Sequence, residues 1–287
     1  MGGNLLEGYR PDMSAPTIVF ADIDNVPLAI DDGHRRLPDT LALLAAERIV
    51  LVFCSCRTRA EVEGFRQSIG VFHPFVCESG SAAFVPQRYF GTALADARVV
   101  AGYETIEFGL PYPSVVDIVH RTADQLRLGI RGFSDMSVEQ VARECGGSLL
   151  DARLAKLREY TEPFRLLRED PVAERRLVRA LEGLGLSCTR HGAFLHASSA
   201  PGSGAAVAAL RRLYETVAGR LTTALAGRTT DETVGRHVDV VLHAAIGGGI
   251  AETLCWIEDI VDRVRTMRRP AVTPARVATI SAVSAAS

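Results

Sequence analysis

Two aspartates separated by a single residue, Asp22 and Asp24, directly follow the short apolar run 17–21. A second apolar run, 48–54, is followed by Ser55. Apolar runs of this length are typical of buried strands in a parallel sheet, and ligands bind beyond the carboxyl ends of such strands. We therefore expect the three polar side chains to meet at one edge of a sheet. Two carboxylates that repel each other there raise one pKa, and such a pair can act as general acid and base near neutral pH.

The segments around these residues alternate between strand-like and helix-like patterns, which favours an α/β fold. Helix starts are indicated by Ser137, which begins a capping-box pattern, and by the pair Asp170-Pro171. In the last third of the chain we expect a long helix that extends to Leu225. A short helix is expected after the glycines 247–249, which follow another strand-like run and should reach the same sheet edge.

The pattern changes after residue 86 and returns after residue 190, which predicts a core interrupted by an inserted domain of roughly 100 residues. We expect the core to be Rossmann-like, with a parallel sheet between helices. The predicted divisions are a disordered N-terminus 1–16, a core of 17–86 and 191–269, an inserted domain 87–190 and a disordered tail 270–287.

Composition excludes several classes of function. The 287 residues are 47% hydrophobic and carry a net charge of −2, which argues against a nucleic-acid partner because that needs a basic surface. No apolar run approaches the roughly 18 residues of a membrane span. The first 16 residues lack the basic start and apolar stretch of a signal peptide. We expect a cytoplasmic protein that acts on a small molecule, and the sequence carries no signal for an oligomeric state.

The six cysteines have neither a Cys-x-x-Cys pair nor the spacing of a metal finger. Cys54 and Cys56, at alternate positions, are expected to be reduced thiols rather than a disulfide or a zinc site. His191 and His196 alternate along a strand-like run, which favours a structural role. The chain has a single lysine, Lys156.

Longer motifs extend the aspartate pair. Asp22-Ile-Asp24-Asn-Val fits the pattern Asp-x-Asp-x-(Thr/Val). Further matching stretches are SCRTRAEVE (55–63), ESGSAAFVP (78–86), RGFSDM (131–136), AKLREYTEPF (155–164) and RHGAFLH (190–196). On these stretches the chain resembles the haloacid dehalogenase superfamily, and within it the mannosyl-3-phosphoglycerate phosphatase-like branch.

The resemblance implies a hydrolase core with an inserted α+β cap domain. In such enzymes the first aspartate, here Asp22, attacks phosphorus, and the second, Asp24, acts as general acid and base. Ser55 would hold a phosphoryl oxygen, and Mg²⁺ would neutralise charge between carboxylates and phosphate. Arginine suits a carboxylate or a phosphate through bidentate hydrogen bonds. The candidate substrate-binding residues are Ser55, Arg57, Arg131, Arg158, Arg190 and His243.

Each candidate also has a purely structural interpretation. The aspartate pair is then an inherited strand-end turn, and Ser55 caps the following helix. Arg131 and Arg158 would pair with acidic residues of the cap.

Two late motifs of the family are absent. The family carries an Asp-Lys-Gly stretch where this chain has Gly202-Ser203-Gly204, and Lys156 lies in the cap pattern, so Arg211 or Arg212 is the remaining substitute. The family's late acids are also missing, since 244–250 contains no acid. A hard divalent ion held by one carboxylate and a backbone carbonyl would bind weakly.

Removing one preorganised charge from a transition state costs roughly 10²–10³ in rate. We therefore expect a repurposed enzyme without a cofactor, in which Asp22 and Asp24 catalyse metal-independent elimination, cyclisation or isomerisation of a small molecule in a biosynthetic pathway. The alternative is a Mg²⁺-dependent phosphatase of a phosphorylated sugar acid. A second alternative is a non-catalytic binding protein.

Overall fold

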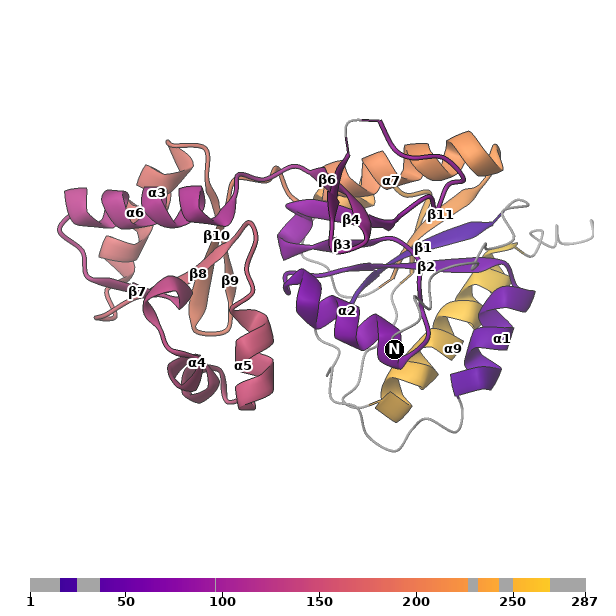
Figure 1. Cartoon of the computed structure of the whole chain (residues 1–287), viewed down its shortest axis with the longest axis horizontal. Helices are drawn as coiled ribbons and strands as arrows, with labels where there is room; N and C mark the ends of the chain where they lie inside the picture. The colour runs from indigo at the N-terminus through magenta and orange to yellow at the C-terminus, as the bar shows by residue number, and fades with distance from the viewer. Residues whose placement is uncertain (1–15, 25–36, 96, 227–231, 243–249, 269–287) are drawn as a thin grey trace, which may run out of the picture.

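The chain folds into two units, each built on its own β-sheet (Figure 1). The computed structural model describes residues 16–24, 37–95, 97–226, 232–242 and 250–268. Within these residues, no helix is long and apolar enough to cross a membrane.

The larger sheet has the strand order β12-β11-β1-β2-β3-β4-β6-β5. The strands from β12 to β3 pair in parallel, whereas β4, β6 and β5 pair antiparallel. The strands are β1 (Thr17–Asp22), β2 (Ile49–Cys54), β3 (Phe75–Cys77), β4 (Ala82–Pro86), β5 (Arg98–Val100), β6 (Tyr103–Glu107), β11 (Thr222–Ala226) and β12 (Val240–Leu242).

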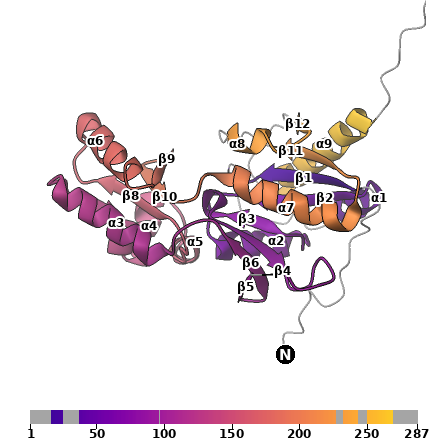
Figure 2. The same ribbon diagram turned by 90° about the horizontal axis from the view of Figure 1, so that it is seen from above.

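Helices cover both faces of this sheet (Figures 1 and 2). Helix α7 lies on one face, and α1, α2 and α9 lie on the other. The helices of this unit are α1 (Leu37–Ala46), α2 (Arg59–Ser68), α7 (Ser203–Ala218), α8 (Glu232–Gly235) and α9 (Ile250–Arg268), with a 3-10 turn at η2 (Glu78–Gly80).

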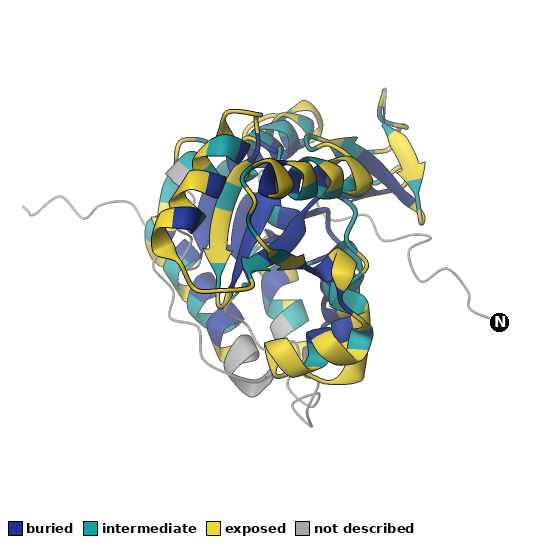
Figure 3. Ribbon diagram, turned by 90° about the vertical axis from the view of Figure 1, so that its left-hand side faces the viewer, coloured by how far each residue is buried: buried dark blue, intermediate teal, exposed yellow. Residues whose placement is uncertain are grey.

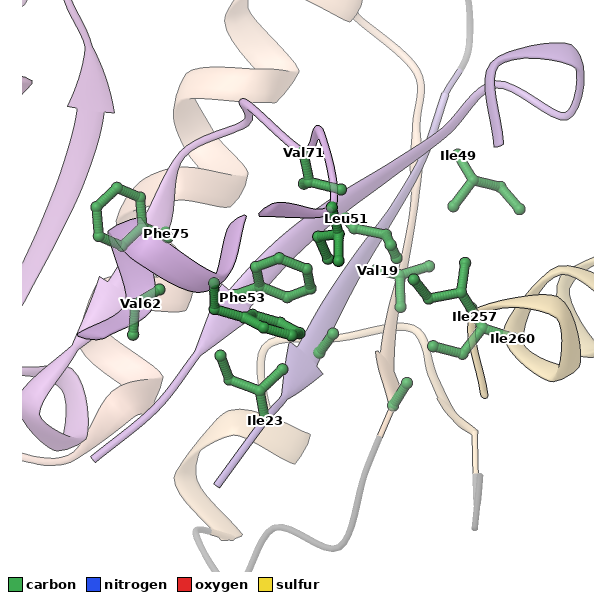
Figure 4. Close-up of a cluster of buried hydrophobic side chains, with 14 of the residues drawn as sticks. Val19, Ile23, Ile49, Leu51, Phe53, Val62, Val71, Phe75, Ile257 and Ile260 are labelled. Atoms are coloured by element: carbon green, nitrogen blue, oxygen red, sulfur yellow. The ribbon is translucent and has the colours of Figure 1, made fainter. Parts of the chain in front are cut away.

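Alternation along the central strands fills a core on each face, because successive side chains of a strand point to opposite sides. Val19 and Leu51 pack against Ile257 and Ile260 of α9 (Figure 4). Their neighbours Ile18, Phe20, Val50 and Val52 pack under α7. Full burial of one such side chain stabilises the fold by roughly 1.5–3 kcal/mol, so the sheet that carries the polar strand ends is rigidly held.

The smaller sheet is antiparallel, with strand order β7-β8-β10-β9. Its helices bury apolar stripes against the sheet and expose their outer faces (Figure 3). The elements are α3 (Tyr112–Gln125), β7 (Ile130–Gly132), η3 (Phe133–Asp135), α4 (Val138–Cys145), α5 (Leu149–Ala155), β8 (Glu162–Leu166), α6 (Pro171–Glu182), β9 (Ser187–His191) and β10 (Phe194–Ser198). The expected helix starts are confirmed, since Ser137 caps α4 in a capping box and Asp170 caps α6.

Three expectations from the sequence differ from the structure. The helix expected to reach Leu225 ends at Ala218, because Gly219 adopts a left-handed φ of 68°, and β11 follows. The helix expected to be short after the glycines 247–249 is α9, with 19 residues. Strands β5 and β6 belong to the larger sheet and β10 to the smaller, so the boundaries expected at 87 and 190 do not coincide with the division between the sheets. The ends 1–15 and 269–287 lie outside the described residues.

Candidate active site

A cavity of about 1010 Å³ lies between the two units. The larger unit lines it with the strand-end residues Asp22, Asp24 and Ser55 and with the start of α7. The smaller unit lines it with β9. The three polar residues expected to meet at one sheet edge therefore lie together, at the carboxyl ends of β1 and β2, as parallel strands require.

Short hydrogen bonds fix the orientation of the aspartate pair. The main-chain N–H of Asp24 donates to Oδ1 of Asp22 over 3.0 Å. The Ser55 hydroxyl and the main-chain N–H of Cys56 both donate to Oδ1 of Asp24, over 2.6 and 2.8 Å. The Arg57 guanidinium donates to the main-chain oxygen of Asp24 over 3.3 Å. Both carboxylates thus accept hydrogen bonds from residues that come directly after β1 and β2.

Burial, followed by the nearby charge of Asp24, raises the pKa of Asp22 from 3.8 to about 6. The hydrogen bond from Asp24 and the charge of Arg57 act in the opposite direction. The carboxylate of Asp22 is therefore ionised at neutral pH and poorly solvated. An ionised oxygen in this setting is a suitable nucleophile.

Ser55 does not cap the following helix. Helix α2 is capped by Thr58, whose hydroxyl accepts from the main chain of Glu61 while the Glu61 carboxylate accepts from the main chain of Thr58. This capping box leaves the Ser55 hydroxyl for Asp24.

The candidate arginines lie in different places. Arg190 lines the cavity and pairs with Glu174. Arg131 is exposed on β7 and does not line the cavity. Arg158 donates to the main-chain oxygens of Cys56 and Ala155, over 2.8 and 3.0 Å, and so ties the smaller unit to the larger one.

Neither Arg131 nor Arg158 pairs with Asp135 or Glu162 among the described contacts. His243, the remaining candidate, lies outside the described residues, as do the glycines 247–249.

No described cation replaces the missing lysine at the start of α7. Lys156 donates to the main-chain oxygens of Phe133 and Met136 inside the smaller unit. Arg211 pairs with Glu215 and Asp239. Asp239 precedes β12, so this pair lies at the amino end of the strands, at the sheet edge opposite Asp22. Arg212 is exposed and does not line the cavity. Neither Arg211 nor Arg212 therefore replaces the missing lysine.

The start of α7 itself lines the cavity through Gly202 and Ser203. A helix N-terminus carries the positive end of the helix dipole, which favours an anion. The start of α7 can pack closely on the turn η2 because Gly80, in that turn, adopts a φ of 89° and lacks a side chain. A Cβ at Gly80 would lie 2.4 Å from Cα of Ser203. The helix end is one positive feature of the cavity, beside Arg190 in its lining and the Arg57 charge that acts on Asp22.

Sequence reasoning missed Cys56 and His191 as residues of the site. Both line the cavity. The His191 ring packs on that of His196, with centroids 4.8 Å apart. Burial lowers the pKa of His196 well below its usual value, so that ring is neutral. The alternation of the two histidines along a strand gave no signal that one of them faces the cavity.

A parallel sheet whose first strand ends in an Asp-x-Asp pair, with an inserted unit over that edge, defines a hydrolase of the haloacid dehalogenase type. The comparisons with known proteins agree. The chain is 34% identical over 198 residues to the glucosyl-3-phosphoglycerate/mannosyl-3-phosphoglycerate phosphatase of Methanococcoides burtonii, covering 69% of this chain and 72% of that protein. It is 30% identical over 200 residues to the protein of the same name from Persephonella marina, covering 69% and 72%. The chain belongs to this phosphatase family.

A solved haloacid dehalogenase-like hydrolase from Bacteroides thetaiotaomicron shares the fold, with a TM-score of 0.50 and 11% identity over 88% of this chain and 100% of that one. No family model matches the chain. The resemblance and the α/β fold expected from the sequence are confirmed, and the protein is an enzyme of the haloacid dehalogenase fold.

The expectation of a metal-independent eliminase, cyclase or isomerase is wrong. Both relatives at 30% identity or more are named phosphatases, and two more distant ones, from Pyrococcus horikoshii and Pyrococcus furiosus, are named mannosyl-3-phosphoglycerate phosphatases. The phosphatase alternative fits these findings better. The expectation gave too much weight to two missing motifs, although Asp22, Asp24 and Ser55 lie together at the strand ends.

Hydrolases of this fold generally use Mg²⁺, and the donor chemistry at the strand ends fits that ion. Mg²⁺ prefers oxygen ligands and is often held by one or two carboxylates together with substrate phosphate and water. Asp22 provides a buried carboxylate, and Asp24 provides a main-chain oxygen at the same edge. These two donors alone would bind Mg²⁺ weakly, and a substrate phosphate would supply further oxygen ligands.

Proposed function

We propose that the protein is a phosphatase that removes the phosphate group from a phosphorylated sugar acid of the glucosyl- or mannosyl-3-phosphoglycerate kind. The observation that carries the proposal is the Asp22–Asp24 pair, which hydrogen bonds fix at the carboxyl end of β1. The cap strand that bears Arg190 lines the same cavity. The substrate class follows from the names of the relatives, and a cytoplasmic location is part of the same proposal.

The roles of the residues follow from their positions. An oxygen of Asp22 bonds to phosphorus as the ester P–O bond breaks, and Asp24 gives a proton to the departing sugar-acid oxygen. Asp24 then takes a proton from the water that hydrolyses the phosphoaspartate, which releases inorganic phosphate and restores Asp22. The Ser55 hydroxyl orients Asp24 throughout.

The anionic substrate is bound from two sides. The start of α7 favours the phosphoryl group through the positive end of its helix dipole. From the cap, Arg190 suits the glycerate carboxylate, because its guanidinium can replace Glu174 with a substrate anion. Mg²⁺, held by Asp22 and the main chain of Asp24, would neutralise charge between the carboxylates and the phosphate.

The test is phosphate release from glucosyl-3-phosphoglycerate and from mannosyl-3-phosphoglycerate, with Mg²⁺ and with a chelator. We expect release from at least one of them, dependent on Mg²⁺ and abolished in Asp22→Asn. An exposed acid in the cap, Asp117→Asn, is the matched control and should retain activity. Folded protein that releases phosphate from neither compound would refute the proposed substrate class.

A further inference from the structure

Three side chains with different donor atoms meet where the two units face each other. Asp24 and Cys56 follow β1 and β2 of the larger unit, and His191 ends β9, the edge strand of the smaller unit (Figure 1). A carboxylate oxygen, the thiol sulfur and a ring nitrogen of these residues all lie within 4.8 Å of one another. The cluster lines the cavity, so an ion can enter from solvent.

The spacing is close to that of a coordination sphere. A tetrahedral zinc ion, with bonds of about 2.0–2.3 Å, separates its ligand atoms by about 3.3–3.6 Å. Ligand atoms as far apart as 4.8 Å would therefore need to approach by roughly 1 Å. Asp24 is already oriented by its two hydrogen bonds from Ser55 and Cys56.

The donor set selects a particular kind of ion. A thiolate and an imidazole favour zinc and similar transition metals, whereas Mg²⁺ takes oxygen ligands. Three protein ligands leave a fourth position for water or for a substrate oxygen. Burial and then the charge of Asp24 raise the pKa of the Cys56 thiol, while the charge of Arg158 acts in the opposite direction. A metal ion that binds the sulfur therefore displaces its proton.

We propose that Asp24, Cys56 and His191 form a zinc-binding site that joins the larger unit to the cap. Zinc there occupies the carboxylate of the general acid and holds β9 against the strand ends. It therefore inhibits the enzyme, whereas Mg²⁺ at Asp22 supports it. The inhibition rests on the proposed phosphatase function, but the binding does not.

Binding is tested with Co²⁺, which takes zinc sites and gives a thiolate-to-metal charge-transfer band when cysteine is a ligand. We expect this band in the wild-type protein, its loss in Cys56→Ser, and metal binding at least about 10-fold weaker in His191→Gln. Cys145→Ser and His120→Asn alter a thiol and an imidazole of the cap outside the cluster and should leave the band unchanged. A band that persists in Cys56→Ser would overturn the site.

A second measurement needs no variant. Zn²⁺ should protect Cys56 of the wild-type protein from alkylation, scored by mass spectrometry of the Cys56 peptide, while the exposed Cys145 remains reactive. Labelling of Cys56 that occurs without Zn²⁺ and is equal with it would refute the site even if Cys56→Ser failed to fold.

Inhibition is then scored as the ratio of phosphatase rates with and without Zn²⁺ for each protein. We expect a lower ratio for the wild type than for His191→Gln. Equal ratios, with cobalt bound, would refute the inhibitory role and leave the binding site standing. Absence of phosphatase activity alone would count against the proposed function, and the cobalt band would still decide the site.

Discussion

At the scale of single residues, the site contains a carboxylate, Asp22, whose ionised form is disfavoured by the fold. The pKa of Asp22 is raised from 3.8 to about 6, chiefly by burial and then by Asp24. Because the folded state favours the protonated form, ionisation of Asp22 destabilises the protein. The penalty is absent below about pH 4, grows between pH 4 and about 6, and is constant above that, at an upper bound of about 3 kcal/mol.

Asp22→Asn removes this penalty, since the amide stays neutral and its oxygen still accepts from Asp24. We expect the free energy of unfolding to rise by about 1–3 kcal/mol at about pH 7.5 and to stay nearly unchanged at about pH 4. Denaturant unfolding of both proteins at the two pH values measures the difference.

Asp239→Asn is the matched control for that substitution. Burial raises the pKa of Asp239, but the hydrogen bonds from Thr223 and the charge of Arg211 outweigh burial and lower it. This variant should therefore lose stability at neutral pH. A loss of stability at neutral pH in Asp22→Asn as well would contradict our account of the nucleophile.

At the scale of elements, the start of α7 borders the cavity. Ser203, the first residue of α7, stands where the family's Asp-Lys-Gly stretch has its lysine. If the helix end is the weaker substitute, Ser203→Lys should raise kcat, by up to about 10²-fold, since one preorganised charge contributes roughly that much. Steady-state phosphate release measures the gain.

Thr216→Lys adds the same charge to the exposed part of α7, about 20 Å further along the helix, and should leave kcat unchanged. Ser203→Lys that folds, depends on Asp22 and gains no rate would show that the missing lysine is not what limits this enzyme.

The elements also show how far the sequence predicts this fold. Strands β1 and β2 were predictable because they are short apolar runs with polar ends, and α4 and α6 because their caps are local signals. Strand β11 was missed because its apolar residues continue the pattern of α7, and only the three residues 219–221 separate the two elements. Local pattern identifies an element well where its ends are marked by polar or turn residues.

The candidate site divides in the same way. Asp22, Asp24 and Ser55 were predictable as a group, since each follows a strand of one parallel sheet. The proximity of Cys56 to His191 was not, because it depends on how the cap sits on the core. Two of the partners of Arg158 are main-chain oxygens, which a pattern of side chains does not reveal.

At the scale of the whole molecule, one buried carboxylate connects the two units. Glu78, in the turn η2 of the larger unit, is 1% exposed. It accepts hydrogen bonds from the main-chain N–H groups of 159, 160 and 161 in the smaller unit, over 2.8, 3.1 and 2.7 Å. The Thr161 hydroxyl adds a fourth, over 2.7 Å. The main chain of the same turn donates to the main-chain oxygens of Ser55 and Arg57, so the turn couples the cap to the segment that follows β2.

Both oxygens of Glu78 accept hydrogen bonds, so Glu78→Gln places an amide N–H₂ against at least one donor. A buried donor left without an acceptor costs about 1–3 kcal/mol. Burial raises the pKa of Glu78 in spite of these hydrogen bonds, so the neutral amide also relieves a desolvation cost. We therefore expect the free energy of unfolding to fall by no more than that amount, and kcat/KM to fall with it, because the cap is no longer held over Asp22. Glu144→Gln is the matched control: it removes a surface pair with Arg165 inside the cap and should cost less than about 1 kcal/mol. Equal unfolding free energies for the two variants would mean that the units are joined by their apolar contacts and by Arg158 rather than by Glu78.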